Sequence, residues 1–300
     1  MRPIDRFRGS LVGLACGDAV GTSVEFAPRG TFQQVTDMVG GGPFRLDAGQ
    51  WTDDTSMALC LADSLLESGF DPLDQMRRYC KWWIEGYNSS TGACFDIGLT
   101  VRAALERFQL SGEPFAGSTD PRTAGNGSLM RLAPVVLYGY PDLEAIASLA
   151  AESSRTTHAA PQAVECCRVL GALLGMALGG APKRILERAC GLTLEEPVVA
   201  DIAAGAYLSK QVAEIRGSGY CVASLEAALW CFHRTDSFKD AVLAASNLGE
   251  DADTTAAIAG QLAGAHYGIE GIPSHWLERV WQREQIQRLA DRLYDRALRK

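Results

Sequence analysis

The sequence has no apolar run of the roughly 18 residues that a membrane-spanning helix needs. Its first residues, Met1 to Asp5, also lack the apolar segment of a signal peptide. These two absences lead us to expect a protein with no membrane span, located in the cytoplasm.

Paired cysteine spacing is missing as well. The nine cysteines include no C-x-x-C pair, and Cys166 and Cys167 are adjacent, which disfavours a disulfide between them. The spacing therefore gives no indication of a zinc site. Dispersed free cysteines are typical of a reducing compartment, where they behave as small buried apolar residues.

Basic residues are the minority charge, with 28 Lys and Arg against 36 Asp and Glu, for a net charge of -8. This balance argues against nucleic acid as a non-specific partner, because phosphate backbones attract Lys and Arg. The composition, 47% hydrophobic and 21% charged, is that of an ordinary globular protein. A chain of 300 residues buries enough surface to be stable without disulfides or a structural metal.

The chain also lacks the alternating apolar pattern of β-strands, and its apolar residues instead recur at helical spacing. Helices are predicted over residues 4–16, 55–68, 73–86, 98–109, 128–137, 143–153, 160–179, 197–216, 223–233, 238–246, 254–267 and 277–298. No linker or repeat divides the chain, so we predict an all-α protein, a compact multi-helix single domain spanning residues 1–300, and by default a monomer. Long loops at 27–50 and 110–127 are candidates for function, since such connections are uncommon otherwise.

Two acidic clusters stand directly before predicted helices. In Thr52-Asp53-Asp54 a hydroxyl precedes two carboxylates, and helix capping would explain one acid but not two that repel each other. The second cluster, Glu250 to Thr255, precedes a nearly uncharged helix in which Gly260 and Gly264 allow close packing. An acidic group at the mouth of a buried helix is costly unless cations or hydrogen bonds compensate it. Hard divalent cations prefer these oxygen donors, so metal binding is the better interpretation.

The two clusters and three further motifs resemble the ADP-ribosylglycohydrolase family, in the family's order and over nearly the whole chain. The motifs are Gly13-Leu14-Ala15-Cys16-Gly17-Asp18-Ala19-Val20-Gly21 with Glu25, Trp51 to Thr55, Ala124-Gly125-Asn126-Gly127-Ser128-Leu129-Met130-Arg131, Thr157-His158, and Gly249 to Thr255. The resemblance implies two divalent cations, Mg²⁺ or Mn²⁺. It implies these metal ligands: Thr52, Asp53, Asp54, Asp251, Asp253 and Thr254.

The same resemblance implies the remaining site residues. One of Glu25, Asp53 or Asp251 would accept the proton of the attacking water, whereas Glu25 on its own would pass for a solvated loop carboxylate. Asp18 is expected to order its loop by hydrogen bonding. The Gly-rich loop and other segments would bind ADP-ribose through Gly125, Asn126, Gly127, Ser128, His158 and Tyr220.

Three of these assignments have plain structural alternatives. His158 could be a hydrogen-bonded structural residue, and Tyr220 could be ordinary core packing instead of stacking on adenine. Arg131 could pair with a phosphate or form an internal salt bridge. Asp96 matches an acidic position of arginine-specific members, where a carboxylate would pair with a guanidinium, or it could cap the helix predicted from residue 98.

The resemblance thus implies a metal-dependent hydrolase that removes ADP-ribose from an arginine of an ADP-ribosylated protein substrate, with ADP-ribose as the product. If the protein is an enzyme, the alternative activity is hydrolysis of serine-linked ADP-ribose or of O-acetyl-ADP-ribose. If it is not an enzyme, the alternative is a non-catalytic relative that binds ADP-ribose. A two-metal phosphate-ester hydrolase is disfavoured because neither cluster contains histidine.

Overall fold

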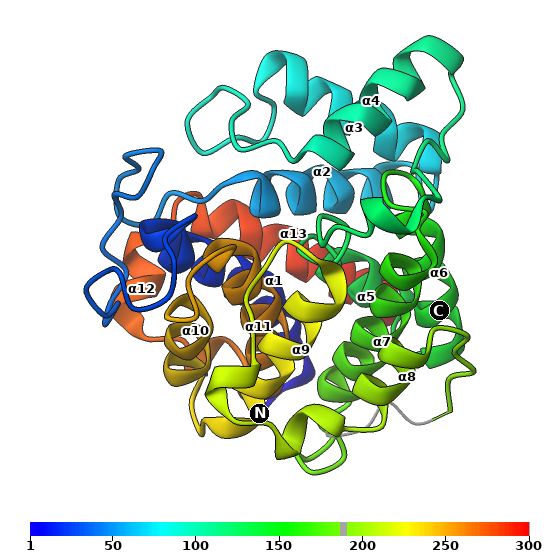
Figure 1. The fold of residues 1–300 in the computed structure, drawn as a ribbon. Helices are drawn as coiled ribbons and strands as arrows, with labels where there is room; N and C mark the ends of the chain where they lie inside the picture. The colour runs from blue at the N-terminus through cyan, green and yellow to red at the C-terminus, as the bar shows by residue number, and fades with distance from the viewer. Residues whose placement is uncertain (187–190, 300) are drawn as a thin grey trace.

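Two helices rich in small residues form the centre of the fold in the computed structural model, which describes residues 1–186 and 191–299 (Figure 1). α1 (Pro3–Gly21) and α11 (Ala252–Tyr267) are buried along most of their length and lie side by side. Glycine stands at every fourth residue of α1 from Gly9 to Gly21, and a Cβ at Gly13 would overlap the carbonyl of Gly260. Glycine therefore lets the two backbones touch. Close packing of α11 was predicted from the spacing of its own glycines, but the matching glycines of α1 were not recognised.

The other helices surround this pair, and the all-α prediction is confirmed. In Figure 1, α3 and α4 lie beyond α2, while α5 to α8 form one flank and α10 and α12 the other. The remaining helices of the described residues are α2 (Asp53–Glu67), α3 (Pro72–Glu85), α4 (Leu99–Ser111), α5 (Ala133–Gly139), α6 (Leu143–Arg155), α7 (Pro161–Leu178), α8 (Pro197–Ala203), α9 (Cys221–Arg234), α10 (Phe238–Ser246), α12 (Ser274–Arg279) and α13 (Arg283–Ala297). Within residues 1–186 and 191–299 the only β-pairing is three isolated bridges.

Three predicted helices were wrong in extent. The helix predicted over 128–137 begins only at Ala133, because turns occupy the chain before it. The one predicted over 197–216 ends at Ala203, and Gly205 then takes a left-handed φ of 87° before two short 3₁₀ turns. The one predicted over 277–298 is interrupted at Gln282, whose φ of 53° divides α12 from α13.

α7 is long and apolar enough to span a membrane by length and composition alone, with a mean hydropathy of 1.2 over its 18 residues. However, 72% of that stretch is buried inside the protein, where α7 packs against α6, α9 and α11. Its apolar character is therefore accounted for by the core. No other helix within the described residues meets the same criteria.

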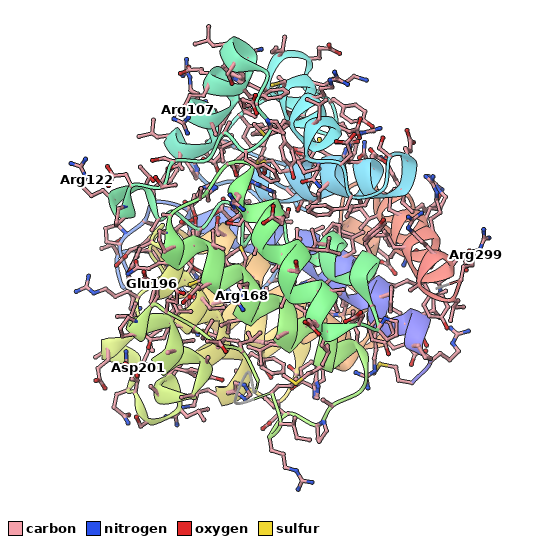
Figure 2. All side chains as sticks on the ribbon, turned by 90° about the vertical axis from the view of Figure 1, so that its right-hand side faces the viewer. Arg107, Arg122, Arg168, Glu196, Asp201 and Arg299 are labelled. Carbon is pink, nitrogen blue, oxygen red and sulfur yellow. The ribbon has the colours of Figure 1, made fainter. Side chains whose placement is uncertain are left out.

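Charged side chains such as Arg122 and Arg299 project outward, as Figure 2 shows. The described residues nevertheless include eight buried carboxylates, and five of these gather where α1 and α2 meet the start of α11. These five are Asp18, Glu25, Asp53, Asp54 and Asp253. The fold therefore concentrates buried negative charge at one end of its central helix pair.

Candidate functional site

The structure brings the two acidic clusters together. Thr52 Oγ1 lies 3.4 Å from Asp253 Oδ2, and Thr254 Oγ1 lies 3.4 Å from Asp54 Oδ2. Each contact joins residues about 200 positions apart in the chain. The contacts form because α2 and α11 both begin at this point, with Thr52 and Asp251 as their N-cap residues.

The first cluster does not cap its own helix, because Asp18 of α1 does so from outside. Thr52 shows no side-chain capping bond. Instead, Asp18 Oδ1 accepts the backbone N–H and the hydroxyl of Thr52, each at 2.9 Å. Asp18 Oδ2 accepts the backbone N–H of Thr55 at 3.0 Å and its hydroxyl at 2.6 Å. Capping thus fails to explain Asp53 and Asp54, and Asp18 orders this segment.

Glu25 caps α11 from outside that helix, as Asp18 caps α2. It follows the 3₁₀ turn η1 (Thr22–Val24), and its Oε2 accepts the backbone N–H groups of Ala252 and Asp253 at 2.7 and 3.1 Å. Asp251, the N-cap residue, shows no side-chain capping bond of its own. Glu25 is therefore an anchored carboxylate and is not solvated, and the Asp251 side chain does not cap α11.

Burial raises the pKa of every acid in this group. It raises the pKa of Asp18 to about 6, against the opposing effect of its hydrogen bonds from Thr55 and Thr52. It raises the pKa of Glu25 to about 8, with further repulsion from Asp251. The pKa values of Asp53, Asp54 and Asp253 also rise well above the ordinary value, because these carboxylates are desolvated and repel their neighbours. Ionising them all at neutral pH requires compensating positive charge.

The donors present fit divalent cations. Asp54 Oδ1 is buried and has no hydrogen-bond partner among the described residues. Within the described chain, no Lys or Arg forms an ion pair with Asp53, Asp54, Asp251 or Asp253. Oxygen atoms of Asp18, Asp54 and Asp253 lie within 4.8 Å of one another, as do those of Glu25, Asp251 and Asp253. Asp253 thus belongs to two adjacent groups of oxygen donors.

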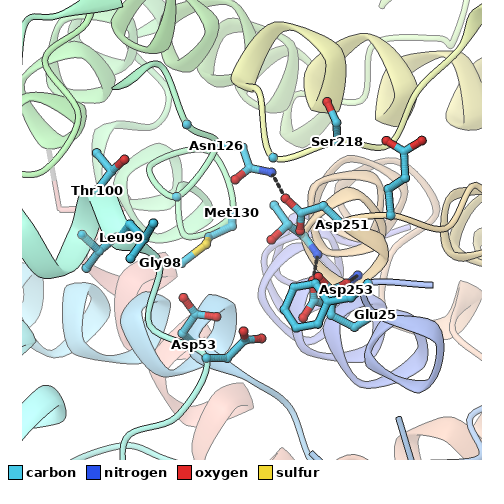
Figure 3. A pocket seen from close by; sticks show the side chains of 18 of the residues that line it. Glu25, Asp53, Gly98, Leu99, Thr100, Asn126, Met130, Ser218, Asp251 and Asp253 are labelled. Carbon is cyan, nitrogen blue, oxygen red and sulfur yellow. Dashed lines mark hydrogen bonds between the residues drawn. The ribbon is translucent and has the colours of Figure 1, made fainter. Parts of the chain in front are cut away.

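A pocket of about 540 Å³ opens directly over these acids (Figure 3). Most of the predicted site residues line it: Glu25, Asp53, Asp96, Gly125, Asn126, Gly127, His158, Asp251, Asp253 and Thr254. Thr52 and Asp54 are fully buried and do not line it. A pocket of this volume accommodates a nucleotide-sized ligand.

The Gly-rich loop connects the pocket to the acidic group. Asn126 Nδ2 donates to Asp251 Oδ2 at 2.8 Å and to Ser224 Oγ at 2.8 Å, and the first of these bonds is drawn in Figure 3. Gly125 and Gly127 lie against the His158 ring, where a Cβ at Gly127 would come within 2.8 Å of Cε1. Ser128 departs from the prediction, because its buried hydroxyl bonds Ser154 and lies outside the pocket.

His158 is held in one protonation state by a short chain of hydrogen bonds. Arg131 Nη2 donates to Thr157 Oγ1 at 2.7 Å, and Thr157 Oγ1 lies 2.8 Å from His158 Nδ1. Among the described residues, Nδ1 is the only acceptor within reach of the Thr157 hydroxyl proton, so Nδ1 accepts and Nε2 carries the hydrogen. Burial, aided by Arg131, lowers the pKa of His158 to about 3. His158 therefore presents a neutral N–H donor to the pocket.

Arg131 fits neither of its sequence-based interpretations. It is fully buried and forms no ion pair with any described residue, so neither the phosphate contact nor the internal salt bridge holds. Its guanidinium instead donates to the Gly127 carbonyl at 2.9 Å and lies over the ring of Tyr79. Arg131 thus holds the Gly-rich loop in place through the Gly127 carbonyl.

Asp96 and Tyr220 flank this arrangement. Asp96 lines the pocket, and α4 is capped at Gly98, so the capping interpretation of Asp96 is wrong. Burial raises the pKa of Asp96 to about 7. Tyr220 is 42% exposed and donates to Gln162 at 2.5 Å, which excludes simple core packing, although it does not itself line the pocket.

Comparison with known proteins identifies the family to which the chain belongs. The ADP-ribosylglycohydrolase family profile matches residues 1–300, the whole chain. The chain belongs to this family. As a member of the ADP-ribosylglycohydrolase family it is a glycosyl hydrolase, and the resemblance stated from its motifs is confirmed.

Individual relatives agree with this membership. The chain is 49% identical to the ADP-ribosylarginine hydrolase Tri1 of Pseudomonas putida (strain GB-1) over 98% of its own length and 79% of that protein. It is 35% identical to the ADP-ribosyl-[dinitrogen reductase] glycohydrolase of Rhodospirillum rubrum, over 96% of this chain and 95% of that protein. A solved ADP-ribosylglycohydrolase-related protein complex contains a chain with 46% identity and a TM-score of 0.88, covering 98% of this chain and 99% of that one.

Sequence reasoning missed several pocket residues. These are Phe26, Leu99, Val101, Met130, Ser218 and Gly219, among others. Apolar and small residues carry no chemical signature, so their place in the pocket depends on the tertiary fold. Phe26 alone gave a usable signal, because it directly follows the candidate Glu25.

Proposed function

We propose that this glycohydrolase removes ADP-ribose from an arginine side chain of a modified protein, with two divalent cations bound by the converging acidic clusters. The observation that carries the proposal is a group of buried carboxylates that pair with no Lys or Arg of the described residues and lie directly under a pocket that also contains Asp96. Relatives named ADP-ribosylarginine hydrolase, at 45% and 49% identity, support the arginine linkage.

Thr52, Asp53, Asp54, Asp251, Asp253 and Thr254 would hold the cations. Mg²⁺ and Mn²⁺ both suit these carboxylate and hydroxyl oxygens. When bound, such cations neutralise the carboxylates, lower the pKa of water and orient hydroxyl groups of the substrate. Asp18 and Glu25 leave the ligand side chains free for this role, because they cap α2 and α11 in their place.

Glu25 would accept a proton from the attacking water. Its Oε2 is anchored to the start of α11, and the side chain lines the pocket. Asp53 and Asp251, the other candidates, belong to the ligand set. Cleavage of a glycosidic bond at the ribose would proceed through an oxocarbenium-like transition state, as in glycoside hydrolysis generally.

The pocket walls would orient the substrate. The diphosphate would lie against Gly125 and Gly127, which line the pocket and carry no side chain. His158 would donate its Nε2 proton to the ligand, and the exposed Tyr220 ring would stack on the adenine at the edge. Asp96 would pair with the guanidinium of the arginine side chain, which leaves unmodified and still attached to the target protein.

The direct test is release of ADP-ribose from polypeptides carrying it on arginine or on serine, and from O-acetyl-ADP-ribose, with and without a chelator. We expect cleavage of the arginine linkage, abolished by the chelator and restored by Mg²⁺ or Mn²⁺. Preferential cleavage of another linkage would refute the arginine assignment. Binding of ADP-ribose without any product release would identify a non-catalytic relative instead.

A further inference from the structure

Three phenylalanine rings form a continuous patch at the edge of the pocket. Phe26 and Phe44 meet edge to face at 6.1 Å between ring centroids, and Phe44 and Phe95 meet at 5.3 Å. Phe26 is 63% exposed, and the other two rings are partly exposed. The three residues, here called the aromatic rim, come from three separate segments of the chain. Phe26 stays largely exposed in this group, so burial of apolar area does not account for its position.

The backbone holds Phe26 in this exposed position against its own preference. Phe26 has a φ of 62°, a left-handed conformation that is unfavourable for a bulky residue. Two backbone hydrogen bonds impose it, from Phe26 N–H to the Glu250 carbonyl at 2.7 Å and from Glu250 N–H to the Ala27 carbonyl at 2.8 Å. Glu250 is itself left-handed, with a φ of 61°. Such conformations cluster at functional sites, and here the strained backbone presents an aromatic ring to solvent.

The aromatic rim is continuous with one side of the pocket. Phe26 lines the pocket next to Glu25, and Phe95 directly precedes Asp96, which also lines it. Asp96 is the residue assigned above to the arginine. The aromatic rim thus begins where the modified side chain would leave the pocket and join its own polypeptide.

We infer that the aromatic rim binds the target polypeptide next to its modified arginine, through an apolar side chain of that polypeptide. The inference rests on the proposed function, because it needs a protein substrate with arginine at the Asp96 side. The charge nearby sets a second requirement. Glu250 is partly exposed beside Phe26, and its nearest cation, Arg216, lies 4.0 Å away. Acidic residues flanking the modified arginine would therefore be disfavoured.

The test compares a small and a large substrate on the same variants. Phe44 is the most suitable position, because it joins the other two rings without lining the pocket. For Phe44→Ser we expect kcat/KM on an ADP-ribosylated polypeptide to fall about tenfold, the equivalent of about 1.4 kcal/mol. Hydrolysis of ADP-ribosylated free arginine should stay within twofold of the unmodified enzyme. Phe44→Trp, which keeps an aromatic ring, should retain most activity on the polypeptide.

A matched control is Leu110→Ala, which removes an apolar side chain that is 91% exposed on α4 and lies outside the pocket. It should leave both substrates unaffected. Equal losses on both substrates for Phe44→Ser would assign the aromatic rim to ADP-ribose binding and overturn the inference, as would no loss on either. If the unmodified enzyme cleaves neither substrate, the proposed function fails and this inference fails with it. A thermal melt within a few degrees of the unmodified enzyme excludes unfolding as the cause.

Discussion

Asp18 Oδ1 accepts both hydrogen-bonding groups of Thr52, the backbone N–H and the hydroxyl, although the two residues lie 34 positions apart. With the two bonds from Thr55, a single carboxylate fixes the start of α2 from a different helix. Asp18 therefore holds the start of α2 in position, and the proposed binding of ligands is left to other residues.

Asp18→Ala should weaken both folding and cation binding. It leaves four buried donors without their acceptor, so we expect a loss of about 2–4 kcal/mol in the free energy of unfolding, measured with urea. The affinity for Mn²⁺ should fall as well, since Thr52 and Asp54 lose their support. Asp142→Ala is the matched control, because Asp142 caps α6 locally. It should lower stability by about 1 kcal/mol and leave Mn²⁺ affinity unchanged. Unchanged affinity in Asp18→Ala would contradict the positioning role.

Asp253→Asn should abolish turnover while keeping the fold. Asp253 belongs to both groups of oxygen donors, and asparagine keeps its shape but removes its charge. Without cations the variant should melt at a higher temperature than the unmodified protein, because it removes repulsion among buried carboxylates. Calorimetry with and without Mg²⁺ measures this. Near-native activity in excess Mg²⁺ would show that the cations bind elsewhere.

The stability of the cation-free protein should decrease as pH rises. Burial places the pKa values of Asp18, Asp96 and Glu25 at about 6, 7 and 8. All three lie above the value of about 4 for an unfolded acid. The folded state therefore holds protons that the unfolded state releases, and this contribution is complete below about pH 4 and lost towards pH 8. Mn²⁺ should reverse the loss, so its effect on the melting temperature should be larger near pH 8 than near pH 5. A cation effect independent of pH would argue against a cation site next to these acids.

Asp96→Ala should change the choice of substrate more than general activity. Loss of a carboxylate that pairs with the guanidinium should lower kcat/KM on arginine-linked ADP-ribose by about ten- to a hundredfold, since charged hydrogen bonds contribute roughly 1.5–3 kcal/mol. Hydrolysis of serine-linked ADP-ribose, if measurable, should be unaffected. Parallel losses on both linkages would assign Asp96 to the cation site instead.

Thr157→Val should release the ring of His158. In the unmodified protein, nitrogen chemical shifts of His158 should report a neutral ring with the proton on Nε2 down to about pH 4, because its pKa is about 3. Valine removes the donor to Nδ1, so both neutral forms should be populated and ADP-ribose affinity should fall. A single unchanged form in the variant would show that the hydrogen-bond chain from Arg131 does not control the ring.

The all-helical fold and the acidic clusters were predictable because their signals are local. Helical spacing of apolar residues is visible within a few turns of sequence. The acids before α2 and α11 are also visible locally, because they are more numerous than helix capping requires. The role of Glu25 as the cap of α11 was not predictable, because its partners Ala252 and Asp253 lie more than 220 residues away. The position of Ser128 outside the pocket was not predictable for a related reason. Its hydroxyl has a polar partner in Ser154, which a linear motif does not reveal.

The glycines of α1 add one consequence. Gly21, at the end of α1 that leads to Glu25, contacts the backbone of Ala252 and Asp253, so main-chain atoms fix the spacing there without intervening side chains. No rotamer change can adjust that spacing, and a methyl group at Gly21 would push the end of α1 away from the start of α11. Substitutions that alter the pocket without disturbing this spacing therefore have to lie in the outer loops.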